Sequence, residues 1–138
     1  MIKFAPTIAR LKDAGCRHVE GVLEFVGLTA GPRVSPAFFI VPESDRAQPN
    51  RLSGVHDQKV SEVFSVIVVL DASRRADAVS DALEEEADRV IRALIGWKHP
   101  QASGGCELVG GRLLSMDGQR VAWAISFSAS RHIRKESQ

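Results

Sequence analysis

The chain has 138 residues, of which 44% are hydrophobic and 25% charged, and its 18 basic and 17 acidic side chains leave a formal net charge of +1. These values are ordinary for one globular domain and argue against wholesale disorder. The near-neutral balance also argues against tight phosphate binding, because proteins that live on nucleic acid usually carry a strong basic excess or a basic stripe.

The two cysteines, Cys16 and Cys106, are far apart in the sequence and form no CxxC pattern. This arrangement favours reduced thiols in a cytoplasmic protein over a disulfide framework. The first residues contain no long apolar stretch, so we expect no secretory signal. The longest apolar run, residues 66–70, has the length of a strand and is too short to span a bilayer.

The first element along the chain is predicted to be a short helix. Phe4, Ile8 and Leu11 recur at helical spacing, Pro6 suits a first turn, and Gly15 follows as a stop. The pattern therefore predicts a helix that turns one apolar face to the core.

A short strand over residues 17–20 is the next possibility, and residues 22–28 stay ambiguous, with one or two helical turns as one interpretation. Residues 31–36 are predicted to be a loop because of their glycine and prolines. Residues 37–41 lie between two prolines and are apolar on both faces, which predicts a strand in the middle of the sheet.

The central part of the chain is predicted to be a polar loop followed by an unusually long strand. Residues 43–54 show no apolar period and should project into solvent or onto a partner. Residues 55–70 alternate at first and then become apolar on both faces. Their length exceeds the usual five to six or so residues of a strand, and a strand that outruns its core often has a partner along the excess.

A turn over residues 71–75 leads into an amphipathic helix predicted over residues 76–95, with Gly96 as its end. Acid-before-base pairs four residues apart support it on the polar face. The apolar stripe consists of Val79, Leu83, Ala87, Val90, Ile91 and Leu94.

The last elements are a loop over residues 97–105 and a hairpin. Residues 108–116 and 119–132 are predicted to pair through the Asp117-Gly118 turn. The second of these strands alternates, with an apolar core face that includes Trp123 and a flat face suited to a close neighbour. The flat face carries the small side chains of Ala122, Ala124, Ser126 and Ser128.

These elements predict an α/β (α+β) fold, a mainly antiparallel sheet with a long β-hairpin covered by two helices. A single domain is expected over residues 1–138, with about 132–138 as a loose polar tail.

Signals of chemistry are sparse. No P-loop, dinucleotide-binding, hydrolase, zinc-protease or EF-hand motif occurs, so neither a catalytic site nor a cofactor is predicted. The four histidines are scattered and favour surface positions, although a cluster of Cys16, Cys106 and a histidine stays open. The acidic run at residues 84–86 is interpreted as a solvated helix face rather than a site for a metal or a basic partner. Trp97 fits either a core plug or an interface.

Several segments together resemble the phage tail terminator family, over nearly the whole chain. The order and spacing carry the resemblance, and residues 17–31 match least. The matching residues are Pro36-Ala37-Phe38-Phe39-Ile40-Val41-Pro42, Glu43, Asn50, Gln58, Val60, Glu62, Phe64, Val66, Leu94-Ile95-Gly96-Trp97, Gly110-Gly111-Arg112-Leu113, and Trp123 to Phe127.

The resemblance implies a structural virion protein with no catalytic residues and no membrane partner. It implies a homohexameric ring that caps the head-proximal end of the tail tube, ends tail polymerisation and joins the tail to the head. The expected partners are further copies of this chain, the tail tube protein and a head–tail connector or neck protein, while phage DNA passes through the pore without specific binding. Assembly in the bacterial host cytoplasm, from a phage or a prophage, is expected.

A ring requires two different patches on each subunit that meet each other. The strand over residues 55–62 and the loop over residues 43–54 are predicted to contact a neighbour or the tube. The candidate interface residues are Asp45, Arg46, Asn50, Arg51, His56, Gln58, Val60 and Glu62. Three alternatives stay open: another neck or head-completion protein, a small α/β enzyme or ligand-binding domain, and a dimeric accessory protein of no fixed role.

Overall fold

The computed structural model describes residues 1–21, 34–73, 76–116 and 119–136. The elements in chain order are α1 (Ala5–Asp13), β1 (Val19–Glu20), β2 (Ala37–Ala47), β3 (Val55–Asp71), α3 (Ala76–Leu94), β4 (Glu107–Met116) and β5 (Arg120–Glu136). The strands form one sheet in the order β1-β2-β3-β5-β4, in which β1 runs parallel to β2 and the other neighbours are antiparallel. The predicted α+β fold with a mainly antiparallel sheet is confirmed.

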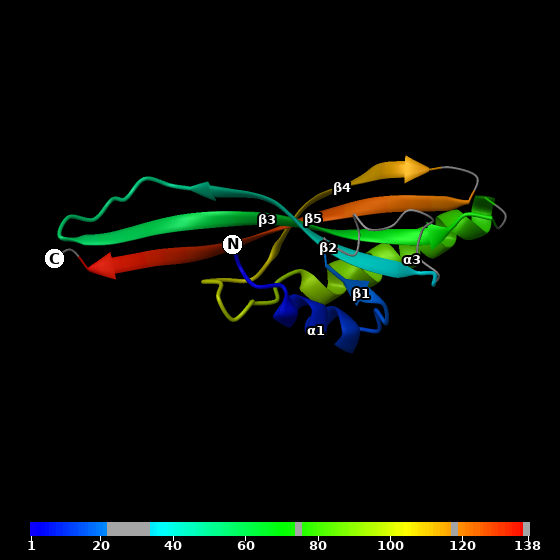
Figure 1. The fold of residues 1–138 in the computed structure, drawn as a ribbon, viewed down its shortest axis with the longest axis horizontal. Coiled ribbons are helices and arrows are strands. Elements are labelled where there is room, and N and C mark those ends of the chain that lie inside the picture. The colour runs from blue at the N-terminus through cyan, green and yellow to red at the C-terminus, as the bar shows by residue number, and fades with distance from the viewer. Residues whose placement is uncertain (22–33, 74–75, 117–118, 137–138) are drawn as a thin grey trace.

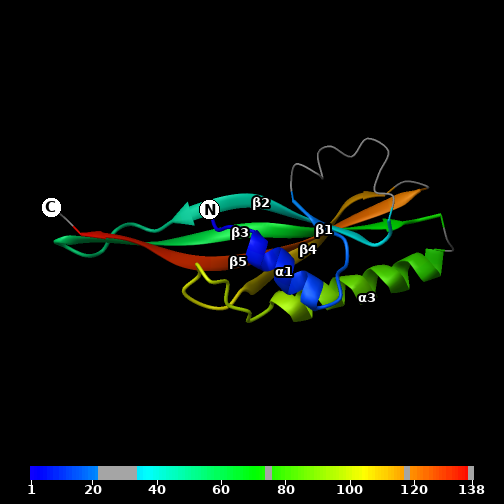
Figure 2. The same cartoon turned by 60° about the horizontal axis from the view of Figure 1, so that its bottom comes forward.

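Helices α1 and α3 lie on the same side of the sheet (Figures 1 and 2). The body of the protein consists of this helical layer and the sheet above it. β3 and β5 leave the body together and continue far beyond it toward the left of Figure 1. The elongated shape follows from strands that are much longer than the layer that covers them.

Helix α1 forms where the sequence predicts it. Pro6 lies in its first turn, and Leu11 is completely buried. Gly15 follows the helix with a φ of +102°, the left-handed conformation that glycine adopts readily at a helix end. The guanidinium Nε of Arg10 donates to the carbonyl oxygen of Ala93 at 2.9 Å, which ties α1 to α3.

Helix α3 turns its predicted stripe to the sheet, where Val90 and Leu94 are completely buried. On the outer face, Arg92 binds Asp88 at 2.7 Å, and Arg89 lies 3.8 Å from Glu85. Such pairs, with the acid four residues before the base, each stabilise a helix by about 0.2–0.5 kcal/mol. The predicted helix is therefore confirmed, with its end one residue earlier than expected.

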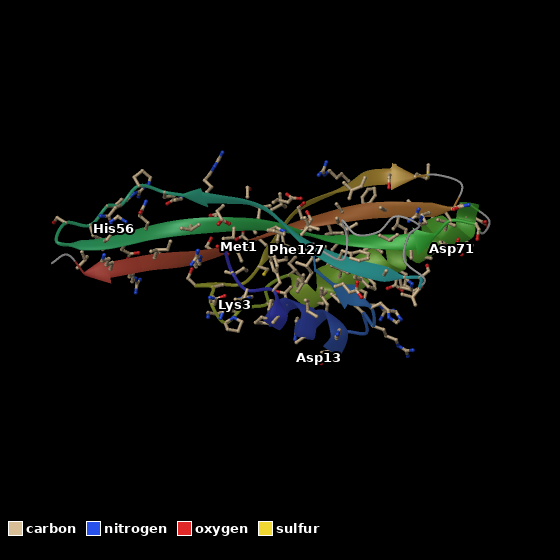
Figure 3. The ribbon with its side chains drawn as sticks, viewed as in Figure 1. Met1, Lys3, Asp13, His56, Asp71 and Phe127 are labelled. Atoms are coloured by element: carbon tan, nitrogen blue, oxygen red, sulfur yellow. The ribbon has the colours of Figure 1, made fainter. Side chains whose placement is uncertain are left out.

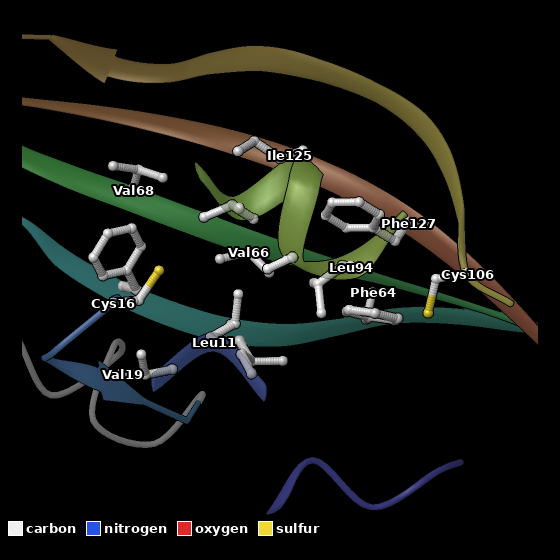
Figure 4. Packing of buried hydrophobic residues seen from close by; sticks show 14 of the residues in the cluster. Leu11, Cys16, Val19, Phe64, Val66, Val68, Leu94, Cys106, Ile125 and Phe127 are labelled. Carbon is white, nitrogen blue, oxygen red and sulfur yellow. The ribbon is translucent and has the colours of Figure 1, made fainter. Parts of the chain in front are cut away.

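The core lies between the helices and the sheet (Figure 4). Phe64 and Phe127 stack with ring centroids 5.8 Å apart and are 1% and 0% exposed. Burying one such ring contributes roughly 1.5–3 kcal/mol. Trp97 packs against this cluster and places its ring edge-on to His99, so it plugs the core. The expectation that histidines lie on the surface is wrong for His99, which is completely buried.

Strand β2 is longer than the sequence predicts, and residues 43–47 are strand rather than loop. The pairing with β3 continues past Pro42 through a register shift between Pro42 and Ser44. Among the described residues, β1 pairs with β2 only at Phe38 and Phe39, so no described strand lies beside Pro42 on that side of β2. Proline is tolerated at an edge position or a bulge because no neighbouring strand needs its missing N–H group.

Strand β5 is also longer than predicted. Residues 132–136 were expected in a loose tail, but they continue β5 and pair with residues 55–59 of β3. The expectation is wrong for these residues because an ordered partner strand satisfies their backbone groups. Other expected segments lie outside the described residues, namely the ambiguous segment 22–28, residues 31–33 of the loop, residues 74–75 of the turn, the Asp117-Gly118 turn and residues 137–138 of the tail.

Candidate subunit interface

The most distinctive feature of the molecule is an arm without a core. The buried side chains of β3 and β5 end at Val60 and Ala129, which are 5% and 2% exposed. We define the arm as residues 48–59 and 131–136, which lie beyond them (Figures 1 and 3). At about 3.4 Å per residue, the five residues 55–59 extend β3 about 17 Å beyond Val60 and the core.

The tip of the arm is held by its own polar side chains. The amide of Asn50 donates to the carbonyl oxygens of Leu52 and Val55 at 3.2 and 3.4 Å. Its oxygen accepts the backbone N–H of Asp57 at 2.9 Å. Asn50 was predicted to contact a neighbour, but the structure engages its side chain within the arm, where it shapes the loop.

Three further candidate residues lie in the arm, with His56 and Gln58 on β3 and Arg51 in the loop before it. His56 Nε2 lies 2.5 Å from Gln58 Oε1, and the Gln58 amide donates to the carbonyl oxygen of Gln48 at 2.9 Å. His56 and Arg51 are exposed, whereas Gln58 is half-buried by the loop. Of these three, Arg51 and His56 are therefore the side chains most open to a neighbouring molecule.

The two strands of the arm are also joined by a charged cluster. Asp57 lies 2.8 Å from His132 Nδ1 and accepts a hydrogen bond from Arg134 Nε at 3.2 Å. The hydrogen bond from His132, with help from the positive charge of Arg134, lowers the pKa of Asp57. The sequence interpretation missed this cluster because it assigned His132 to a loose tail.

At the base of the arm, two candidate interface residues are buried inside the protomer. Glu62 is 3% exposed and accepts hydrogen bonds from the backbone N–H of Ile2 at 2.7 Å and from Arg131 Nε at 2.9 Å. The amino group of Met1 also lies 2.9 Å from it. Val60 is buried as well, so in a single copy neither side chain is open to the surface, and a contact of Glu62 or Val60 with a neighbour stays a prediction.

The remaining two candidates stand at the end of β2. Asp45 and Arg46 are exposed, and the Asp45 carboxylate lies 3.4 Å from the amino group of Met1 (labelled in Figure 3). Thus the structure brings Asp45 and Arg46 to the base of the arm and Arg51 and His56 to the arm itself.

The flat face predicted on β5 is not an open surface along its whole length. Ala122 and Ala124 are buried against Phe39 of β2 and neighbouring residues of β3. Farther along, the Ser126 hydroxyl lies 2.8 Å from the Ser65 hydroxyl. The small side chains allow close packing inside the protomer, so the prediction of a neighbour at Ala122 and Ala124 is corrected.

An apolar edge strand was not predicted as a contact surface. β4 is the last strand of the sheet and pairs only with β5 among the described strands. Two register shifts bend it, and its side chains are largely exposed. The exposed apolar residues of β4 are Leu108, Val109, Leu113, Leu114 and Met116. An exposed, apolar sheet edge is typical of a site where another chain binds. The adjacent apolar pairs around Gly110-Gly111 were the available sequence signal.

A groove of about 970 Å³ lies between β4 and α3. Leu83 and Ile91 of α3 form one wall, Leu108 of β4 forms the other, and Trp123 of β5 contributes to the lining. Gly111 is needed beside Trp123, because a Cβ atom there would lie 2.9 Å from the indole nitrogen. The α3 side also carries Asp81, Glu84, Glu85 and Asp88, which give the groove an acidic rim.

The described residues offer no cluster of three or more His, Cys, Asp or Glu side chains that could hold a metal ion. Cys16 and Cys106 are both buried, and burial raises the pKa of each thiol to about 11. The His99 ring is held by two backbone contacts, since its Nδ1 accepts the N–H of Gln101 at 2.9 Å and its Nε2 lies 2.6 Å from the Lys3 carbonyl oxygen.

Within the described part of the chain, no helix has the length and apolar character needed to cross a membrane.

The family model described as "Phage tail terminator protein" matches residues 1–138 of the chain. The chain belongs to the phage tail terminator family. This membership confirms the family resemblance of the sequence and makes the protein a structural component of a phage tail, which points away from an enzymatic role.

The fold has a counterpart among solved structures. It is similar to a chain in the structure titled "Virion of native gene transfer agent (GTA) particle", with a TM-score of 0.52 and 14% sequence identity. The match covers 92% of this chain and 84% of that chain. No curated protein sequence matches the chain.

Proposed function

We propose that this phage tail protein caps the head-proximal end of the tail tube as a ring, ends tube polymerisation and provides the surface to which the head connector binds. The observation that carries the proposal is the arm. It consists of paired strands with no core beneath them and with exposed apolar side chains at Leu52, Val55 and Ile133. Such a structure gains stability when another molecule covers it.

The distribution of the exposed surfaces supports a ring in particular. The arm lies at one end of the molecule and the apolar edge of β4 lies on the body (Figure 1). An interface between two different patches is heterologous, and a heterologous interface produces a closed ring when the rotation between subunits closes. A ring of six copies is the form that we propose.

The charge of the chain supports a passage for DNA. With a formal net charge of +1, the protein lacks the basic excess that would bind the phosphate backbone strongly. We propose that DNA passes through the ring without specific contacts. The other proposed partners are the tail tube protein and the connector or neck protein, and assembly takes place in the host cytoplasm.

Electron microscopy of phage particles that lack this protein tests the proposal. Loss of a terminator leaves the tube end free to grow, so overlong tails without heads are expected. Adding purified protein to polymerising tube protein should stop growth and restore a uniform length. Filled heads that leak DNA beside tails of normal length would instead identify a head-completion protein and refute termination.

A deletion tests the role of the arm within this function. Removing residues 45–53 deletes the exposed loop, including Arg51, together with the last residues of β2. We expect the variant to lose ring formation and tail joining. If both survive, the arm makes no essential contact with a neighbour or with the tube.

A further inference from the structure

We propose that the arm of one copy docks into the groove between α3 and β4 of the next copy, and that this contact builds the ring. The inference rests on the proposed ring function and names the two surfaces that meet in it. It follows from the shape, charge and apolar content of two surfaces of the same chain.

The groove is apolar inside and acidic at its rim. Leu83, Ile91, Leu108 and Trp123 line it, and Leu108 is 42% exposed. Helix α3 carries six acidic and two basic residues. The two arginines of α3 are engaged by its own carboxylates, as the contacts of Arg92 and Arg89 show. The rim therefore keeps a surplus of negative charge, to which Glu84 and Glu85 of the acidic run contribute.

The arm has the opposite character. It contains five basic residues against two acidic ones, namely Arg51, Lys59, Arg131, Arg134 and Lys135 against Asp57 and Glu136. Apolar side chains stand among these charges, with Leu52 50% and Ile133 44% exposed. A basic arm with apolar side chains complements an apolar groove with an acidic rim. Charge complementarity of this kind guides association and selects the partner.

The two surfaces cannot meet within one copy. β5 contributes Ile125 to the groove and Arg134 to the arm. These residues are nine apart on one continuous strand, which separates them by about 30 Å at about 3.4 Å per residue. A strand paired along its length does not fold back on itself, so the complement of the groove is the arm of another copy. The contact is heterologous and repeats from subunit to subunit.

Charge reversal tests the contact. The arm variant Arg51→Glu with Lys135→Glu and the groove variant Asp81→Lys with Glu84→Lys change exposed or half-buried side chains outside the core. We expect each to weaken self-association, measured by sedimentation at low salt, at least tenfold. In an equimolar mixture the arm of each variant matches the groove of the other, so alternating copies should regain association to within about threefold of the wild type. A chain carrying all four changes should regain it to the same extent. The control, Lys12→Glu with Lys98→Glu, changes exposed charges outside both surfaces.

A cross-link tests the same contact on assembled tubes. Chains with Lys135→Cys and chains with Glu84→Cys are mixed during tube capping and then oxidised. The native thiols are buried and react slowly, so a disulfide-linked dimer that requires both variants supports the docking. Capped tubes without this dimer, or a cross-link to the tube protein instead, overturn it. Normal rings in every variant would refute only the docking, whereas wild-type protein that fails to limit tube length refutes the proposed function.

Discussion

Replacing Glu62 at the base of the arm should destabilise the whole protein. The Glu62 carboxylate is 3% exposed and joins the N-terminal segment, through the N–H of Ile2, to β5, through Arg131. Glu62→Leu removes the acceptor of these two donors at once, together with the counter-charge of the Met1 amino group, which lies 2.9 Å from the carboxylate. The buried N–H group of Ile2 then lacks its partner, and Arg131, whose side chain is 25% exposed, loses its counter-charge.

The size of the effect follows from these two losses. An unsatisfied buried N–H group costs about 1–3 kcal/mol, and removing one member of a buried ion pair costs about 3–5 kcal/mol in total. Because Arg131 is partly open to water, we expect about 3 kcal/mol at neutral pH. Glu62→Gln keeps an uncharged oxygen acceptor and should cost about 1–2 kcal/mol. Urea unfolding at unchanged m-value measures both differences.

Glu85→Gln is the matched control. The Glu85 carboxylate is 71% exposed and lies 3.8 Å from Arg89, so its loss should cost less than about 0.5 kcal/mol. If Glu62→Leu is as stable as the wild type to within about 0.5 kcal/mol, the cost of burying the carboxylate cancels its hydrogen bonds, and our account of the arm base is incorrect.

Three other predictions follow from single contacts. Gly111→Val should cost about 1–3 kcal/mol by forcing Trp123 aside, and the control Gly110→Ala, whose Cβ atom meets nothing within 4 Å, should change the free energy of unfolding little. The two cysteine thiols, with pKa values of about 11, should react with a thiol reagent at pH 7 only as fast as the protein opens; rapid labelling of the folded protein would refute this. The hydrogen bond from His132 lowers the pKa of Asp57 below 3.8, so carboxyl NMR should find a lower midpoint; this contact stabilises the arm above pH 3.8, and its contribution is lost as the pH falls through the folded value.

The body of the fold was predictable because its apolar residues repeat with clear periods. The stripe of α3 places one face of the helix on the core, and burial confirms it, with Val90 and Leu94 completely buried. A pattern of this kind exists only where one side of an element is buried and the other is open. The sequence was therefore most informative where the core is.

The arm was less predictable for the same reason. Residues 131–136 lie over no core, so neither face of β5 needs to be apolar there, and a polar sequence looks like a tail. Only the pairing with residues 55–59, which are distant in the sequence, makes them a strand. Likewise, the continuation of β2 past Pro42 depends on which side of the strand stays open, a property of the assembled sheet.

The candidate interface, too, could be predicted from the sequence only in part. Val60 and Glu62 have the same parity along β3 as the core residue Phe64, which made their burial partly predictable. The hydrogen bond from the Ile2 N–H to Glu62 was not visible in the sequence. The groove was beyond reach, because it depends on how two register shifts bend β4 away from α3.

In an isolated molecule, the arm lowers stability and the edge of β4 beside the groove favours unwanted association. A two-stranded ribbon is marginal by itself, and its basic residues repel one another without a counter-charge. An apolar sheet edge invites unwanted pairing, and an acidic rim is self-repelling. Both costs fall when the arm of one copy covers the groove of the next, since apolar area is buried and opposite charges meet in the same step. In the proposed ring, each surface would keep enough charge to stay in water until the partner surface is presented, so the same charges that oppose premature contact select the matching one.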